Sequence, residues 1–275
     1  MCVDRNKKRR LGQVGKMKTL SSDILGQGKP LLLLHGLFAS KSNLRMLAKQ
    51  LASEYQVHAL DLPLHGASSD CSALDLDDMA LAVEEYSSMQ GLDAPAIVGH
   101  SLGGKVAMSV ALRARIEIAQ LVVVDIAPVR YEGSHGAVFA GIRGVASKAC
   151  TSRAQARTVL AECVSEAMVQ EFLLTQLRRS ECHGSMQWVF NWQALEQAYE
   201  ELLKAPSSLE PVDTRTLFIR GALSDYVTDQ NLAVARALFP RSRVLTFKGV
   251  GHWLHAEKPE QFVQAVLQFL VSDAK

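Results

Sequence analysis

Residues 97–108 read IVGHSLGGKVAM, and this stretch decides the fold that the sequence predicts. The strand-like segment APAIV runs into the motif, and a helix-compatible stretch follows it. Where a strand turns directly into a helix, flanking glycines remove the Cβ atoms that would clash. Gly-x-Ser-x-Gly in this context is typical of a nucleophile elbow, which exposes the serine hydroxyl beside the free N–H groups of a helix N-terminus. We therefore expect Ser101 to be a nucleophile.

Short apolar runs alternate with segments of helical period along most of the chain. The strands predicted from these runs are 18–25, 30–36, 56–63, 94–100, 119–128, 214–221 and 241–249. The predicted helices are 42–55, 76–90, 102–114, 229–239 and 258–271. Strands that are followed by helices of roughly 10–15 residues form βαβ units. The sequence therefore predicts an α/β fold, with a mostly parallel central sheet flanked by helices on both faces.

Residues 129–212 interrupt this alternation. They lack strand-like runs and have helical spacing at 151–164, 166–177 and 190–204. We interpret this segment as a helical cap, or lid, inserted into a core made by residues 17–128 and 213–275.

The basic N-terminus is set apart from the rest of the chain. Residues 1–16 hold six basic side chains and one acidic side chain, a charge of +5 in a chain whose net charge is +2. We expect a disordered extension here and no nucleic-acid partner, because blocks of like charge are usually solvated.

The composition excludes further classes of protein. No apolar run approaches the roughly eighteen residues of a membrane span, so none is expected. The five cysteines are scattered without CxxC spacing, which is typical of a reduced, cytoplasmic protein. The histidines show no HExxH pattern, and Gly99, Gly103 and Gly104 do not form a dinucleotide fingerprint. We therefore expect no metal and no cofactor.

A serine hydroxyl is a weak nucleophile and needs an imidazole within hydrogen-bond reach as its general base. Residues 251–262, GHWLHAEKPEQF, contain His252 in a glycine-flanked loop before the last predicted helix. His255 is the alternative base, and we favour His252 because it alone has that loop position. His35 and His65 are interpreted as structural residues of their loops.

Five motifs together resemble one family of enzymes. They are LLHGLFAS, GHSLGGKVAM, VVVDIAPV, WVFNWQAL and GHWLHAEKPEQF. Over residues 18–272 the chain resembles the α/β-hydrolase-fold serine hydrolases, and among them the small capped esterases of bacteria and their mitochondrial α/β-hydrolase-domain relatives. The resemblance implies that His252 is the general base. It also implies an oxyanion hole made by the backbone N–H groups of Leu102 and Leu37, with Phe38 as the alternative to Leu37.

Two aspartates are candidates for the acid that orients His252. Asp125 ends the predicted strand LVVVD, and the carboxyl ends of strands are where α/β sheets gather their chemistry. Asp225 follows the next strand, at the commoner position for this fold, but Ser224 stands where many members have the aspartate. We favour Asp125 and keep Asp225 as the alternative.

The resemblance implies a cofactor-free carboxylesterase or acyl-thioesterase that cleaves short- to medium-chain acyl esters through an acyl-enzyme. The alternatives are hydrolysis of a C–C bond or a lactone by the same triad, and a non-catalytic hydrolase-fold protein that binds a partner. The expected ligand is a small-molecule acyl ester or thioester, and the expected state is a monomer or weak homo-oligomer. Phe38, Trp188 and Trp253 are expected to contact the substrate.

Overall fold

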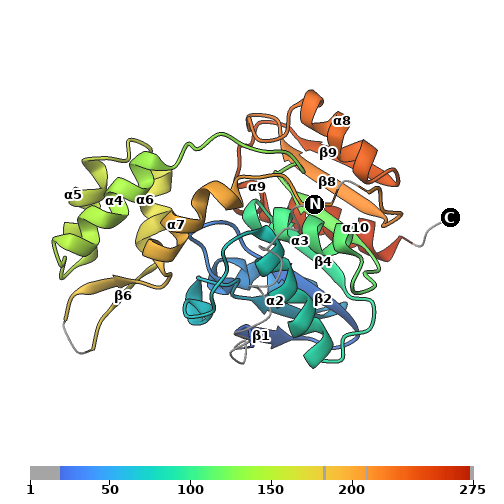
Figure 1. Cartoon of the computed structure of the whole chain (residues 1–275), viewed down its shortest axis with the longest axis horizontal. Helices are drawn as coiled ribbons and strands as arrows, with labels where there is room; N and C mark the ends of the chain where they lie inside the picture. The colour runs from blue at the N-terminus through green and yellow to red at the C-terminus, as the bar shows by residue number, and fades with distance from the viewer. Residues whose placement is uncertain (1–18, 182–183, 209, 273–275) are drawn as a thin grey trace, which may run out of the picture.

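The computed structural model describes residues 19–181, 184–208 and 210–272, so the predicted extension at 1–16 lies outside the described residues. Within them, one sheet has the strand order β1-β3-β2-β4-β5-β8-β9 (Figure 1). All neighbouring strands are parallel except β1 and β3. This confirms the α/β fold with a mostly parallel sheet. The strands are β1 (Ser22–Leu25), β2 (Lys29–Leu34), β3 (Tyr55–Leu60), β4 (Ala96–His100), β5 (Leu121–Val124), β8 (Thr216–Gly221) and β9 (Ser242–Phe247).

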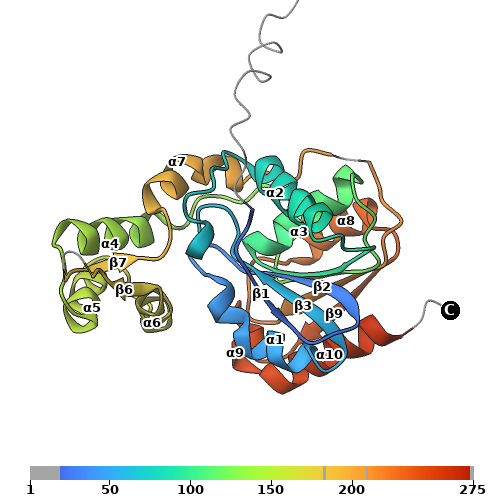
Figure 2. The ribbon, with the colours of Figure 1, turned by 90° about the horizontal axis from the view of Figure 1, so that it is seen from below.

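Helices cover both faces of the sheet (Figure 2). Because successive side chains of a strand point to opposite faces, Leu32 and Leu34 of β2 pack in one core and Leu31 and Leu33 in the other. The first core contains α2 (Leu76–Met89), α3 (Leu102–Arg113) and α8 (Asp229–Leu238), and the second contains α1 (Arg45–Leu51) and α10 (Pro259–Val271). Short helical turns add η1 (Lys41–Leu44), η2 (Gly66–Ser68) and α9 (Leu254–Glu257).

The segment between β5 and β8 forms a separate group of elements beside the sheet (Figure 1). Its helices are α4 (Gly136–Ser147), α5 (Arg153–Ala161), α6 (Ala167–Thr175) and α7 (Trp192–Leu202). It also contains a short antiparallel hairpin of β6 (Leu177–Arg179) and β7 (Met186–Trp188). The expectation that this segment holds no strand was wrong, because strands of three residues are too short to show an alternating pattern.

The helices are short throughout the described ranges, and the longest, α2, has 14 residues. None of them combines the length and apolar character that a membrane crossing requires.

Candidate active site

Ser101 lies at the junction of β4 and α3, where the strand turns directly into the helix. Its backbone φ is +52°, a value that non-glycine residues seldom adopt. A Cβ atom on Gly99 would collide with the backbone of Gly103, and one on Gly103 would collide with the carbonyl oxygen of Leu34. The two glycines of the motif are therefore required, because β4, α3 and the end of β2 approach one another closely at this corner.

Asp125, directly after β5, has a completely buried carboxylate that accepts three hydrogen bonds. The Nδ1–H of His252 donates to Oδ2 at 2.7 Å. The backbone N–H of Gly221 donates to Oδ1 at 2.9 Å, and the hydroxyl of Ser224 donates to Oδ2. A carboxylate on Nδ1 fixes the tautomer of the imidazole and leaves Nε2 as its basic nitrogen.

Asp225, the alternative acid, is exposed and makes no hydrogen bond to His252 among the described residues. Ser224, one position earlier, supplies a hydroxyl to Asp125, which explains the unusual spacing of this loop. Tyr226, one position later, stacks on the ring of His252, with centroids 4.3 Å apart and planes 28° apart. Sequence reasoning missed the contacts of Ser224 and Tyr226, because no local pattern marks a residue that acts on another loop.

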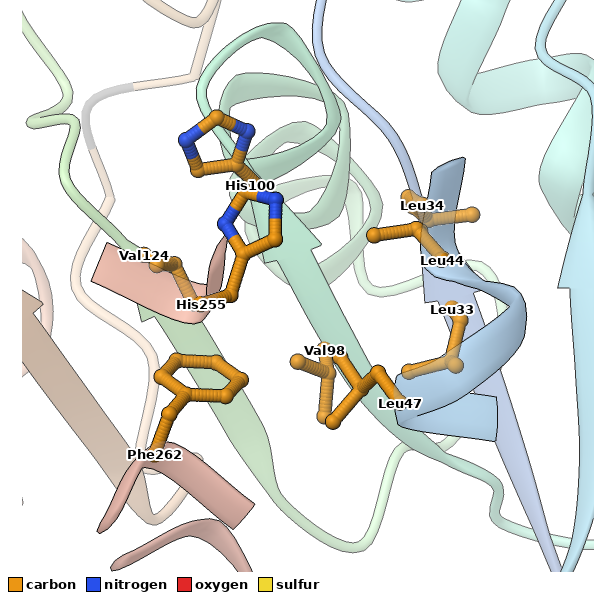
Figure 3. Close-up of a pocket in the computed structure, with 9 residues that line it drawn as sticks. All are labelled: Leu33, Leu34, Leu44, Leu47, Val98, His100, Val124, His255 and Phe262. Atoms are coloured by element: carbon orange, nitrogen blue, oxygen red, sulfur yellow. The ribbon is translucent and has the colours of Figure 1, made fainter. Parts of the chain in front are cut away.

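His100 connects the serine corner with the loop of His252. Its Nε2–H donates to the backbone carbonyl of His252 at 3.0 Å. The ring of His255 lies 4.5 Å from that of His100, and burial lowers the pKa of His255 to about 4. Figure 3 shows these two rings at one end of a small cavity, above Phe262. His255, the alternative base, is therefore a part-buried neutral residue whose ring packs against His100.

The loop after β2 lies next to Ser101. A Cβ atom on Gly36 would lie 3.3 Å from the Cβ of Ser101. The backbone N–H of Phe38 donates to Nε2 of His65 at 3.2 Å, so it is already engaged. The backbone N–H groups of Leu37 and Leu102 make no hydrogen bond to any described residue. Leu37 and Leu102 thus present two free donors on the loop and helix that flank the serine.

His65 holds this loop in place as a neutral imidazole. Its Nδ1–H donates to the carbonyl of Pro63 at 2.8 Å, which leaves Nε2 as the acceptor for Phe38. Burial lowers the pKa of His65 to about 3. His35 itself accepts the backbone N–H of Leu62 at Nε2, at 3.1 Å. Both histidines are therefore buried structural residues of the two loops.

Several of the residues described above line a cavity of about 1460 Å³. Ser101, His252 and Asp225 line it, together with residues from the segment between β5 and β8. These residues lie on or beside helices that meet the sheet only in the folded chain. They include the apolar or aromatic Val138, Val169, Phe172, Leu173, Tyr199, Leu202 and Leu203 and the acidic Glu132, Glu166 and Glu171.

The three aromatic residues expected to contact substrate have different places. Phe38 and Trp253 line the cavity. Trp188 is not in its lining: the ring stacks on Phe190 at 5.3 Å, and Nε1–H donates to the carbonyl of Ile142 at 3.1 Å. The expectation for Trp188 is therefore corrected, because its ring and its polar atom are both used inside the segment between β5 and β8.

Comparisons with known proteins agree with the fold described above. A model of the alpha/beta hydrolase family matches residues 31–265. The mouse protein named sn-1-specific diacylglycerol lipase ABHD11 is 36% identical over 248 residues, which cover 87% of this chain and 80% of that protein. Esterase YbfF of Escherichia coli K12 is 34% identical over 245 residues, which cover 88% and 92%. The solved structure of a marine microorganism esterase superposes with a TM-score of 0.87 at 32% identity, covering 91% and 99%.

Proposed function

Because this chain belongs to the alpha/beta hydrolase family, we propose that it hydrolyses carboxylic esters with Ser101 as nucleophile, His252 as general base and Asp125 as the orienting acid. The observation that carries the proposal is the hydrogen bond from Nδ1 of His252 to the buried carboxylate of Asp125, beside a cavity that Ser101 also lines. Relatives named as an esterase and a lipase support ester hydrolysis as the reaction.

The reaction follows from the roles of these three side chains. Nε2 of His252 takes the hydroxyl proton as Ser101 attacks the acyl carbonyl, and then gives that proton to the leaving alcohol. Water, activated by the same nitrogen, cleaves the acyl-enzyme and regenerates the serine. Asp125 keeps the imidazole in the reactive tautomer and stabilises the imidazolium that forms.

The free N–H groups of Leu102 and Leu37 supply the oxyanion hole. Each tetrahedral intermediate carries a full negative charge on one oxygen, which two preorganised donors stabilise. A donor of this kind contributes about 3–4 kcal/mol to transition-state stabilisation. Phe38 is the weaker candidate, because its N–H is bound to His65.

The segment 129–212 acts as a cap in this proposal, since its side chains form one wall of the cavity above the serine. Apolar side chains such as Val138, Val169 and Phe172 favour an acyl chain as the bound group. The cavity of about 1460 Å³ holds a short- or medium-chain acyl group together with a leaving group. Both oxygen esters and thioesters fit this chemistry.

The test combines labelling with a substrate panel. A fluorophosphonate probe should label the purified protein, and Ser101→Ala should abolish both labelling and turnover of p-nitrophenyl esters. Ser53→Ala, on an exposed serine outside the cavity, is the matched control. Acyl esters, acyl-CoA thioesters and lactones of graded length then define the bond that is cleaved. Full ester turnover by Ser101→Ala would eliminate the mechanism, and a wild-type protein that is not labelled would favour a binding role.

A further inference from the structure

Lys105 is a buried lysine on the wall of the same cavity. It lies one helical turn after the serine in α3, and its backbone N–H donates to the carbonyl of Ser101 at 3.0 Å. Residues four apart share one side of a helix, about 6 Å apart along its axis. The residue is 3% exposed and lines the cavity that contains Ser101 and His252. The mechanism proposed above assigns it no role.

Within the part of the chain that the structure describes, the ammonium group of Lys105 has no anionic partner. It donates to the carbonyl of Leu202, at the end of α7, at 3.0 Å, and lies 5.4 Å from the centre of the Tyr131 ring. It forms no ion pair with a carboxylate of the described residues. Burial, and then the positive charge of Arg130, lower its pKa to about 7. An ammonium carries three N–H donors, so donors remain, and a buried charge is stabilised by a counter-charge.

The side chains that line the cavity differ in their chemistry. In Figure 2, α3 and α7 lie above the strands, α1, α9 and α10 lie below them, and α6 lies in the group of elements beside the sheet. The ring centre of Tyr131 lies 5.4 Å from the ammonium of Lys105, and Tyr131, Ser134, Tyr199 and Tyr226 line the cavity together with Glu132 and Asp225. The lining from α1, α6, α9, α10 and the loop of His252 includes the apolar side chains of Leu47, Val169, Phe172, Trp253 and Val263, together with the carboxylates of Glu166, Glu171, Glu257 and Glu260. The ammonium of Lys105 suits an anionic group, and the apolar side chains suit a hydrocarbon chain.

We propose that Lys105 binds a carboxylate of the substrate, so that the preferred substrates are monoesters of dicarboxylic acids. The inference rests on the ester hydrolase proposed above. The free carboxylate lies toward α3 and α7, and the ester carbonyl lies at Ser101, one helical turn away. A carboxylate matches the single charge of one ammonium, whereas a phosphate dianion would leave a buried negative charge without a partner.

The test compares esters that differ only in that carboxylate. Mono-p-nitrophenyl succinate, glutarate and adipate are paired with p-nitrophenyl butyrate, valerate and hexanoate, which have the same numbers of carbons. The measured quantity is the ratio of kcat/KM for the acid to kcat/KM for its neutral partner. We expect a ratio of at least about tenfold for one chain length, the size of a hydrogen bond to a charged group.

Variants test whether Lys105 is the cause of this ratio of kcat/KM values. Lys105→Met should lower the ratio to near one, and Lys105→Arg should keep most of it because the charge and the donors remain. Lys49→Met, on an exposed lysine of α1 outside the cavity, should leave the ratio unchanged. If Lys105 only ties α3 to the end of α7, Lys105→Met lowers the two rates in equal proportion. An unchanged ratio, or a wild-type preference for the neutral ester at every length, overturns the inference.

A binding measurement separates this inference from the proposed reaction. In Ser101→Ala, calorimetry should show monomethyl glutarate binding about tenfold or more tightly than methyl valerate, and the double variant with Lys105→Met should lose that difference. Equal affinities in Ser101→Ala overturn the role of Lys105, even where the wild type is an esterase. If Ser101→Ala shows the binding preference but the wild type cleaves no ester, the proposed function is refuted and the carboxylate site is supported.

Discussion

The ring of His100 donates a hydrogen bond to the backbone carbonyl of His252, across 3.0 Å. The residue that precedes the proposed nucleophile thus holds the loop of the proposed base. The contact joins β4 to the loop before α9, which no short-range pattern of the sequence connects. Burial and the neighbouring histidines keep the pKa of His100 well below its usual value, so the ring stays neutral and keeps one N–H for this bond.

Replacing His100 with leucine should therefore lower kcat while the protein stays folded. The loop of His252 loses its hydrogen bond, and a displacement of about 1 Å at a reacting group lowers the rate by about 100-fold. Steady-state kinetics with a p-nitrophenyl ester measures the effect, and circular dichroism checks the fold. A kcat equal to that of the wild type would show that other contacts hold the loop.

The Asp125→Asn variant should lose about four orders of magnitude in kcat, because the amide favours the wrong tautomer of His252. The matched variant Asp225→Asn should stay within about threefold of the wild type, since Asp225 is exposed and has no hydrogen bond to His252 among the described residues. Single-turnover acylation rates compare the two directly. The reverse result would assign the acid to Asp225.

The His65→Leu variant should lose both stability and activity. It leaves the N–H of Phe38 and the carbonyl of Pro63 without partners, at a cost of about 1–3 kcal/mol for a buried polar group. The loop that carries Leu37 is then less well positioned, so kcat should also decrease. Urea unfolding and kinetics measure the two effects. A loss of stability with unchanged kcat would indicate that the loop does not contribute a donor.

The His255→Phe variant tests the pH dependence of folding. Burial lowers the pKa of His255 to about 4, from 6.5 in the unfolded chain. Between these values the unfolded chain binds more protons than the folded one, so stability is present above pH 6.5 and is lost as the pH falls toward 4. In the variant, the number of protons taken up on unfolding in this pH interval should fall by up to about one. The slope of the unfolding free energy against pH should fall in proportion.

The same variant should not destabilise the protein at pH 7. Nδ1 of His255 has no hydrogen-bond partner among the described residues, so phenylalanine removes a buried polar atom that nothing satisfies. The small cavity in Figure 3, about 10 Å³, offers room beside Phe262 for the added ring atom. Urea unfolding at pH 7, 6, 5 and 4 measures both effects. An unchanged slope would show that His255 does not titrate between these values.

Much of the architecture follows from short-range patterns in the sequence. The strands of the sheet and the helices of the core appear as apolar runs and helical periods, because local periodicity records which face of an element is buried. The elbow at Ser101 can be predicted from the sequence for a similar reason. Gly99 and Gly103 avoid steric clashes within a few residues of the serine. The β6–β7 hairpin was not predicted from the sequence, because strands of three residues are too short to show an alternation of apolar and polar residues.

The sequence alone determined the fold class, the corner that carries Ser101 and the loop that carries His252. Only the tertiary structure decided which carboxylate meets that histidine and which buried lysine faces the same cavity. The parallel pairing of β5 with β8 brings Asp125 against Gly221 and Ser224, although nearly 100 residues separate them along the chain. Contacts of this kind depend on strand order and register, which the geometry of the whole sheet sets and no local pattern records.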